Sequence, residues 1–311
     1  MATPSHGERL VAPAADAVAA LPRSGILLLV ALTITWGLNW PMMKLALQGV
    51  HPWAFRSMCL MVGGSSLLLL TRASGGSIRL PRGRLLPLAL VAIFNITIWH
   101  LLSAYGLIYT GSGRAAIIGY TMPLWAAPLS VLLLDARLTL PQVLALLLGM
   151  AALVLLIGQD LAVVGSAPLG ALLMATAALS WAIGTVLIKK FAWGGMPVMA
   201  LTGWQQLIGG LPIVLGWWLL EPVPDLGALS LPSALGLAYA VFVAMIFCQT
   251  AYFKLVSLLP AHVAAISVLA VPVVGVISSA FLLGEPVGIA EAAALLLVLG
   301  GLVLLVRAPQ R

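Results

Sequence analysis

Long runs of apolar residues, broken by proline, glycine and charged residues, make up most of the chain. A run of about 18 or more apolar residues predicts a membrane-spanning helix, because about 20 residues at 1.5 Å each cross the ~30 Å hydrocarbon layer. The runs therefore predict an all-α polytopic membrane protein. Its ten expected transmembrane helices lie near residues 25–47, 52–71, 85–108, 113–134, 139–158, 168–190, 196–219, 231–256, 260–283 and 286–307.

The composition supports this prediction. Hydrophobic residues make up 62% of the chain and charged residues 7%, and the mean hydropathy is +1.16. Soluble domains carry about 25% charged residues, so this chain has too few to cover a soluble surface. The net charge of +7 does not predict nucleic-acid binding, because the charges lie at helix ends rather than on a soluble basic domain. Residues 1–24 are rich in Ala and Pro and are expected to form a disordered cytoplasmic tail without a cleavable signal peptide.

The two cysteines, Cys59 and Cys248, both lie in apolar runs and form no CxxC pair. Buried cysteines of this kind behave as small hydrophobic residues. We therefore expect no disulfide, no bound metal and no cofactor.

The basic residues are distributed unevenly between the two sides of the predicted helices. Twelve of the 15 Lys and Arg residues fall on the side of the N-terminus, and three, Lys44, Arg56 and Arg114, fall on the other. Cytoplasmic loops carry the excess of Lys and Arg. Both termini are therefore expected in the cytoplasm, which agrees with an even number of helices.

The two halves of the chain resemble each other in sequence. A shift of 145 residues places Trp36 on Trp181 and Lys44 on Lys189, and a shift of 149 residues places Pro123 on Pro272. This pattern predicts two five-helix repeats, over 25–158 and 168–307. Because five is odd, the repeats must be inverted in the membrane. Inverted repeats are typical of secondary transporters, whose substrate site lies near the membrane midplane between the repeats.

Several motifs resemble the drug/metabolite transporter superfamily and its EamA-type repeat over residues 25–307. These are Trp36-Gly37, the helices with Pro123 and Pro272, and LLGEPVGIAEAAALLLVLGGLVLLV at 282–306. The first half departs from the last motif, because Asp135-Ala136 stands where the second half has Gly284-Glu285. Within the superfamily, the chain is most similar to aromatic amino-acid exporters of the YddG type. The resemblance implies amino-acid efflux across a bacterial inner membrane, with helices 1–4 and 6–9 around a central cavity and helices 5 and 10 to one side.

Polar residues inside the predicted helices are the candidates for substrate contact. No Asp, Glu, Lys or Arg falls near the centre of a predicted span, which argues against a carboxylate proton relay and against phosphate-bearing substrates. His100 is the one deep titratable residue, and the repeat maps it to Gln249. The alternative is that His100 and Gln249 form hydrogen bonds with neighbouring helices, and that the tryptophans only pack between helices or at the membrane interface. The candidate substrate-binding residues are Trp36, Asn39, His100, Tyr120, Trp181 and Gln249.

Four residues are candidates for hinges or kinks: Gly37, Pro41, Pro123 and Pro272. Proline inside a helix removes the hydrogen bond to the carbonyl four residues earlier and so frees that carbonyl. A kink without any ligand contact is the alternative explanation for each of them.

A neutral, aromatic and lightly polar cavity suits a zwitterion with an apolar or aromatic side chain. The sequence therefore predicts an exporter of aromatic and other neutral amino acids that works by alternating access, as facilitated diffusion. The alternative is a multidrug or general metabolite exporter, possibly proton-coupled through His100. No HExxH, GxSxG or paired acids occur in the spans, so an enzyme is not expected. The expected partners are the lipid bilayer and the small-molecule substrate, and the chain is expected to be a monomer or a homodimer.

Overall fold

The computed structural model describes residues 23–134, 139–162, 168–258 and 270–307. Within these ranges the protein is all-helical, as predicted, with no strand. The helices are α2 (Arg23–Ala46), α3 (Pro52–Ala73), α4 (Leu85–Ala92), η1 (Ile93–Ile98), α5 (Trp99–Tyr109), α6 (Ser112–Gly119), α7 (Met122–Leu134), α8 (Leu140–Ala162), α9 (Leu169–Lys190), α10 (Val198–Leu220), η2 (Leu226–Ala228), α11 (Leu231–Ala238), η3 (Tyr239–Cys248), α12 (Gln249–Leu258), α14 (Val271–Leu283) and α15 (Ile289–Arg307).

Eight helical stretches in the described part of the chain are long and apolar enough to cross a membrane. Three of them combine consecutive elements: α4–η1–α5, α6–α7 and α11–η3–α12. Shorter apolar helices, Val271–Leu283 and Ile289–Leu304, lie where the ninth and tenth spans are predicted. The predicted tail at 1–24 lies outside the described residues except for its last two positions.

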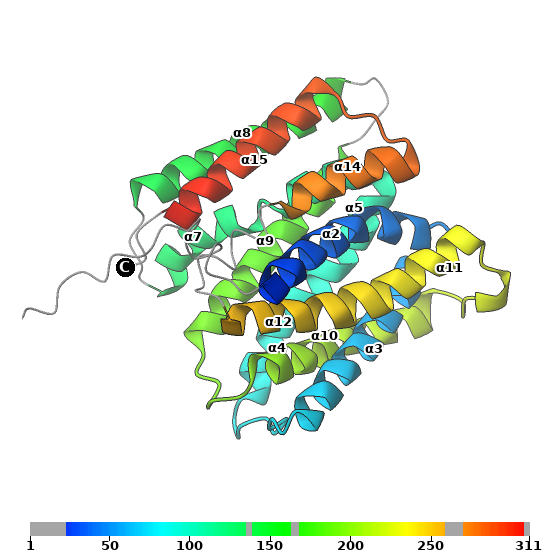
Figure 1. The fold of residues 1–311 in the computed structure, drawn as a ribbon, viewed down its shortest axis with the longest axis vertical. Helices are drawn as coiled ribbons and strands as arrows, with labels where there is room; N and C mark the ends of the chain where they lie inside the picture. Colours follow the sequence, from blue (N-terminus) through cyan, green and yellow to red (C-terminus); the bar gives the residue numbers. More distant parts are fainter. Residues whose placement is uncertain (1–22, 135–138, 163–167, 259–269, 308–311) are drawn as a thin grey trace, which may run out of the picture.

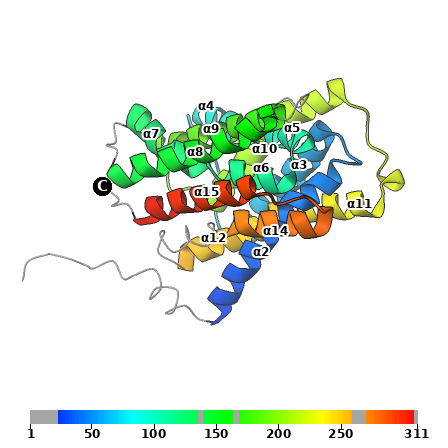
Figure 2. The same ribbon diagram turned by 90° about the horizontal axis from the view of Figure 1, so that it is seen from above.

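The most extensive helix contacts join the first half of the chain to the second. Helix α3 packs along α10, and α8 packs along α15. Figures 1 and 2 both show α8 and α15 side by side, and Figure 1 shows the pair at one edge of the molecule, as the family resemblance implies for helices 5 and 10.

Several further contacts follow the same exchange between halves. Helix α2 packs on α14 and on η3–α12 of the second half, while α9 packs on α6–α7 and on η1–α5 of the first half. In span order, the first helix meets the ninth and eighth, and the sixth meets the fourth and third. Each contact therefore has an equivalent in which the two halves exchange roles.

The fourth span is not one continuous helix. Helix α6 ends at Gly119 and α7 begins at Met122, so Tyr120 and Thr121 lie between them. Pro123 is the second residue of α7, and Pro272 is the second residue of α14. Pro123 therefore lies in the first turn of α7 rather than inside one continuous helix, and its role in a kink stays a prediction. Proline suits the first turn of a helix, where its missing N–H would have no partner.

A kink at Pro272 would free the carbonyl of Val268. This residue belongs to 259–269, which lies outside the described part of the chain. Pro41 does lie inside a helix, α2, as predicted. The hinge roles of all four residues stay predictions.

Candidate functional site

The middle of α2 meets η3 and α12 through aromatic and polar side chains. The Trp36 ring packs edge-on against Tyr252, with centroids 5.5 Å apart. The Tyr239 hydroxyl donates a hydrogen bond to the Thr35 carbonyl at 2.8 Å, and the Thr35 hydroxyl lies 3.3 Å from the Cys248 sulfur. The first predicted site residue, Trp36, is thus placed between the two halves.

The next turn of α2 is buried more deeply. Asn39 is 9% exposed, and its Oδ1 has no hydrogen-bond partner among the described residues. Trp40, beside it, shares a buried cluster with Tyr120 from the break between α6 and α7. Trp36 packs against this cluster as well. An unpaired buried oxygen in a membrane protein is costly and therefore points to a ligand or water.

Gly37 allows a close contact between α2 and α14. A methyl group at this position would lie 2.5 Å from the Cβ of Val274, so no larger residue fits without movement. Close packing by itself thus accounts for the glycine, in addition to the predicted hinge.

The second half repeats the aromatic contact. Trp181 of α9 packs edge-on against Trp99 of α5, with centroids 5.1 Å apart. His100 follows Trp99 directly in α5, and Gln249 lies about one turn before Tyr252 in α12. The predicted residues therefore fall into two groups. Trp36 of α2 packs against α12, the helix that contains Gln249, and Trp181 of α9 packs against α5, the helix that contains His100. Gln249 is half-buried and His100 is buried.

Both of these helices carry a π-helical segment at an equivalent place. Segment η1 (Ile93–Ile98) ends two residues before His100, and η3 (Tyr239–Cys248) ends directly before Gln249. Short π segments inside α-helices often mark functional sites. In η1, the Ser180 hydroxyl donates to the Phe94 carbonyl at 2.7 Å. The Thr97 hydroxyl donates to the Gly209 carbonyl at 2.6 Å, so η1 is linked to both α9 and α10.

A group of buried amides lies next to η1. The Asn95 amide donates to Gln205 Oε1 at 3.5 Å, while Asn95 Oδ1 and Gln206 Oε1 have no partner among the described residues. All three side chains are at most 4% exposed. We did not predict Gln205 and Gln206 from the sequence. The signal for them is the occurrence of two adjacent amides inside an apolar span.

Arg56 corrects the view that cationic residues lie only at the surface of this bundle. It lies in the second turn of α3 and is 2% exposed. Its Nε donates to the His100 carbonyl at 3.0 Å, and its Nη2 donates to the Ser103 hydroxyl at 3.0 Å. The sequence places Arg56 near a helix end, where charged residues are usually exposed, so its burial could not be predicted from the sequence.

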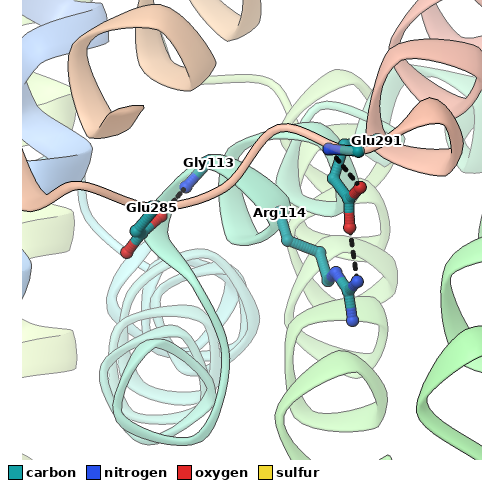
Figure 3. A network of polar contacts seen from close by, with 5 residues as sticks. Gly113, Arg114, Glu285 and Glu291 are labelled. Carbon is teal, nitrogen blue, oxygen red and sulfur yellow. Dashed lines mark hydrogen bonds and ion pairs between the residues drawn. The ribbon is translucent and has the colours of Figure 1, made fainter. Parts of the chain in front are cut away.

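Carboxylates bind two helix N-termini at the loops of the bundle. Figure 3 shows Glu285, from the loop between α14 and α15, at the start of α6. Its carboxylate accepts the N–H of Ser112 at 2.8 Å and that of Gly113 at 3.0 Å. Glu221 likewise accepts the N–H of Ala54 at 3.0 Å, at the start of α3. A negative charge at a helix N-terminus is stabilised by the unpaired N–H groups and the helix dipole.

The same region holds an ion pair between Arg114 and Glu291, drawn in Figure 3. Glu291 also accepts the N–H of Gly288 at 3.0 Å. A cavity of about 200 Å³ lies here, lined by Gly111, Gly113, Arg114, Val276, Glu285, Pro286, Val287 and Glu291.

Lys44 lies in the last turn of α2. Its ammonium donates to the carbonyls of Leu107, Ile108 and Thr110 at the end of α5, the last two at 3.2 and 2.7 Å. Together with Arg56 and Arg114, it completes the set of three cations predicted outside the cytoplasm. Each of the three is engaged by polar groups of the protein.

An all-helical membrane bundle with buried amides and aromatic residues between its two halves is typical of small-molecule transporters. The chain is a member of the EamA-like transporter family, whose sequence profile matches residues 23–158 and 168–307. These two matched segments correspond to the two predicted repeats.

Two bacterial proteins are similar to this chain along most of its length. The uncharacterized transporter YvbV of Bacillus subtilis is 28% identical over 89% of this chain and 90% of its own length. A protein of Salmonella typhimurium named a probable amino-acid metabolite efflux pump is 28% identical over 90% of this chain and 93% of its own. A solved crystal structure shares the fold, with a TM-score of 0.62 and 23% identity over 92% of this chain and 97% of that one.

Proposed function

We propose that the protein exports neutral amino acids, aromatic ones included, across a bacterial inner membrane by alternating access. The observation that carries this proposal is a pair of aromatic contacts between the halves, made by the repeat-equivalent residues Trp36, on Tyr252, and Trp181, on Trp99. Each joins a helix of one half to the π-containing helix of the other. Two aromatic contacts of this kind suit a carrier in which one half moves against the other around a site at their interface.

The chemistry of the residues at this interface supports the substrate class. In this proposal the site is lined by aromatic rings and amides: Trp36, Trp181, Tyr120, Asn39 and Gln249. Such groups suit an apolar or aromatic side chain together with polar ends. The relative named a probable amino-acid metabolite efflux pump supports the same class. The narrower likeness to YddG-type aromatic amino-acid exporters is part of this proposal.

The proposal also includes the topology: ten helices in two inverted repeats, with both termini in the cytoplasm. The exchange of equivalent helix contacts between the halves supports the repeats. The matched segments 23–158 and 168–307 support them too. The protein acts as a monomer or a homodimer.

Facilitated diffusion is the simplest mechanism, because no carboxylate is buried among the described residues. A multidrug or general metabolite exporter coupled to protons is the second candidate. The buried, unpaired Nδ1 of His100 favours it, since this nitrogen could accept a proton.

Transport into proteoliposomes tests both candidates. Labelled Phe, Trp, Met and Thr are offered with and without a proton gradient, beside a cationic drug as an alternative substrate. We expect saturable amino-acid uptake that needs no gradient. Absence of amino-acid uptake would overturn the proposal, and uptake that strictly requires the gradient would overturn facilitated diffusion.

A further inference from the structure

The guanidinium of Arg56 is buried without an anionic partner. It is 2% exposed, and no carboxylate of the described residues lies within ion-pair distance of it. An isolated charge in a low-dielectric interior is strongly unfavourable unless it is paired. Ionisable groups kept inside a membrane protein at such a cost are usually functional.

Only part of the hydrogen-bonding capacity of Arg56 is used. The guanidinium has five N–H donors. One goes to the His100 carbonyl and one to the Ser103 hydroxyl, both at 3.0 Å, and both acceptors are neutral. The ring of Phe55 lies 5.0 Å from the guanidinium carbon. These contacts hold the side chain in place but leave its charge without a counter-ion.

Two more buried polar atoms have no partner among the described residues, one on the residue after Arg56 and one on the residue whose carbonyl accepts the Arg56 Nε hydrogen bond. The Ser57 hydroxyl, on the next residue of α3, has no hydrogen bond within the described chain. Neither has Nδ1 of His100, the residue whose carbonyl accepts the Arg56 Nε hydrogen. Both side chains are at most 5% exposed. A hydroxyl and a neutral imidazole can each donate a hydrogen bond to an anion.

We propose that Arg56 binds the carboxylate of the substrate, with His100 and Ser57 as neutral hydrogen-bond partners. The identity of this carboxylate as that of an amino acid rests on the function proposed above. Guanidinium binds a carboxylate through two parallel hydrogen bonds, which gives direction as well as affinity.

The charge balance favours a carboxylate over a phosphate. Arg56 is the one buried charged residue in the part of the chain that the structure describes. One guanidinium balances one negative charge, whereas a phosphate monoester carries up to two near neutral pH. A purely structural role, in which Arg56 only links α3 to α5, is the competing explanation.

The test uses three ligands that share one aromatic ring. L-Phenylalanine carries both charges, 3-phenylpropionate carries only the carboxylate, and phenethylamine carries only the ammonium. Their affinities are measured by calorimetry or thermal stabilisation on the purified full chain in lipid nanodiscs. We expect the Arg56→Gln variant to bind the two carboxylates about 10- to 100-fold more weakly, because one charge-assisted contact is lost. Its affinity for phenethylamine should stay unchanged, and Arg56→Lys should restore part of the carboxylate affinity.

Ser103→Ala is the matched control. It removes a structural partner of the guanidinium and keeps the charge, so carboxylate affinity should change less than about threefold. Equal effects of Arg56→Gln on all three ligands, or a Ser103→Ala variant with the same loss as Arg56→Gln, would overturn the inference in favour of a structural role.

The unchanged protein gives a second test if Arg56→Gln does not fold. Stabilisation of the natural sequence by 3-phenylpropionate and not by phenethylamine would support the carboxylate site, and the reverse order would overturn it. The two proposals fail separately. Phenylalanine transport with full carboxylate affinity in Arg56→Gln would remove only this inference. Arg56-dependent binding of 3-phenylpropionate without amino-acid transport would remove only the proposed function.

Discussion

The carboxylate of Glu285 accepts hydrogen bonds from both the main-chain N–H and the hydroxyl of Ser112, at 2.8 and 3.0 Å. These two residues come from different halves of the chain and lie 173 positions apart. Gly284, the residue before Glu285, ends α14 with φ of +64°, a conformation that favours glycine. The Gly284-Glu285 pair thus turns the chain and places a carboxylate on the N-terminus of α6.

Replacing Glu285 should destabilise the protein. Glu285→Ala removes the acceptor of two main-chain N–H groups at a helix start, and caps of this kind contribute about 1–2 kcal/mol. Thermal or denaturant unfolding in detergent measures the loss. Asp225→Ala is the matched control, because Asp225 accepts one N–H in an exposed loop and should cost little. Equal stabilities of the two variants would contradict this account of Glu285.

Lys44 and its repeat equivalent, Lys189, should differ in their effect on stability. The Lys44 ammonium occupies three carbonyls at the end of α5, whereas Lys189 is exposed. Cations at helix C-termini contribute about 0.3–1 kcal/mol when exposed and up to about 2 kcal/mol when partly buried. We expect Lys44→Met to lower the unfolding free energy by about 1–2 kcal/mol and Lys189→Met to leave it nearly unchanged. An unfolding free energy left unchanged by Lys44→Met would show that the contact of Lys44 with the end of α5 contributes nothing to stability.

The close approach of α9 to η1 gives a third prediction. A methyl group at Gly184 would lie 1.8 Å from Asn95 Oδ1, so Gly184→Ala must displace a buried amide. Overpacking of this kind costs about 1–3 kcal/mol. At Gly158 in α8, no atom of the described residues lies within 4 Å of the same position, so Gly158→Ala should be neutral or slightly stabilising. Melting temperatures of the two variants test this, and a stable Gly184→Ala protein would argue against the packing of α9 on η1.

The sequence predicted the helices better than it predicted the site, for a physical reason. Apolar runs report that a segment is buried in lipid or protein, and so they located the helices. They do not report which face of a helix meets which neighbour. Arg56 near a helix start looked like a surface charge, and only the packing of α3 on α5 reveals its burial.

The break at Tyr120 was missed for a related reason. Pro123 signals an interruption of the helix but does not fix its position, because proline is compatible with both a kink and a helix start. The structure puts the break at Tyr120 and Thr121, before the proline. The aromatic contacts of Trp36 and Trp181 were predicted only as equivalent positions, since their partners Tyr252 and Trp99 depend on the packing between the halves.

The proposed topology can be tested with introduced cysteines. The native Cys59 and Cys248 are both buried and unpaired, so labelling by a membrane-impermeant maleimide should have a low background. Ser77 and Asp225 are exposed and lie in loops that the charge distribution places on opposite sides. In intact cells we expect Asp225→Cys to be labelled and Ser77→Cys to be labelled only after permeabilisation. The opposite pattern would invert the proposed orientation.

Asn39 provides the most direct test of a substrate contact on α2. Its Oδ1 is buried without a partner among the described residues, so Asn39→Ala removes an unsatisfied atom and should leave stability unchanged or slightly higher. If the amide binds substrate, the same change should lower the initial rate of amino-acid uptake by about tenfold or more. Ser130→Ala is the control, because the Ser130 hydroxyl bonds only the Ala126 carbonyl of its own helix. Full transport by a folded Asn39→Ala protein would show that substrate does not use this amide, and a loss of both stability and transport would assign Asn39 to packing between helices.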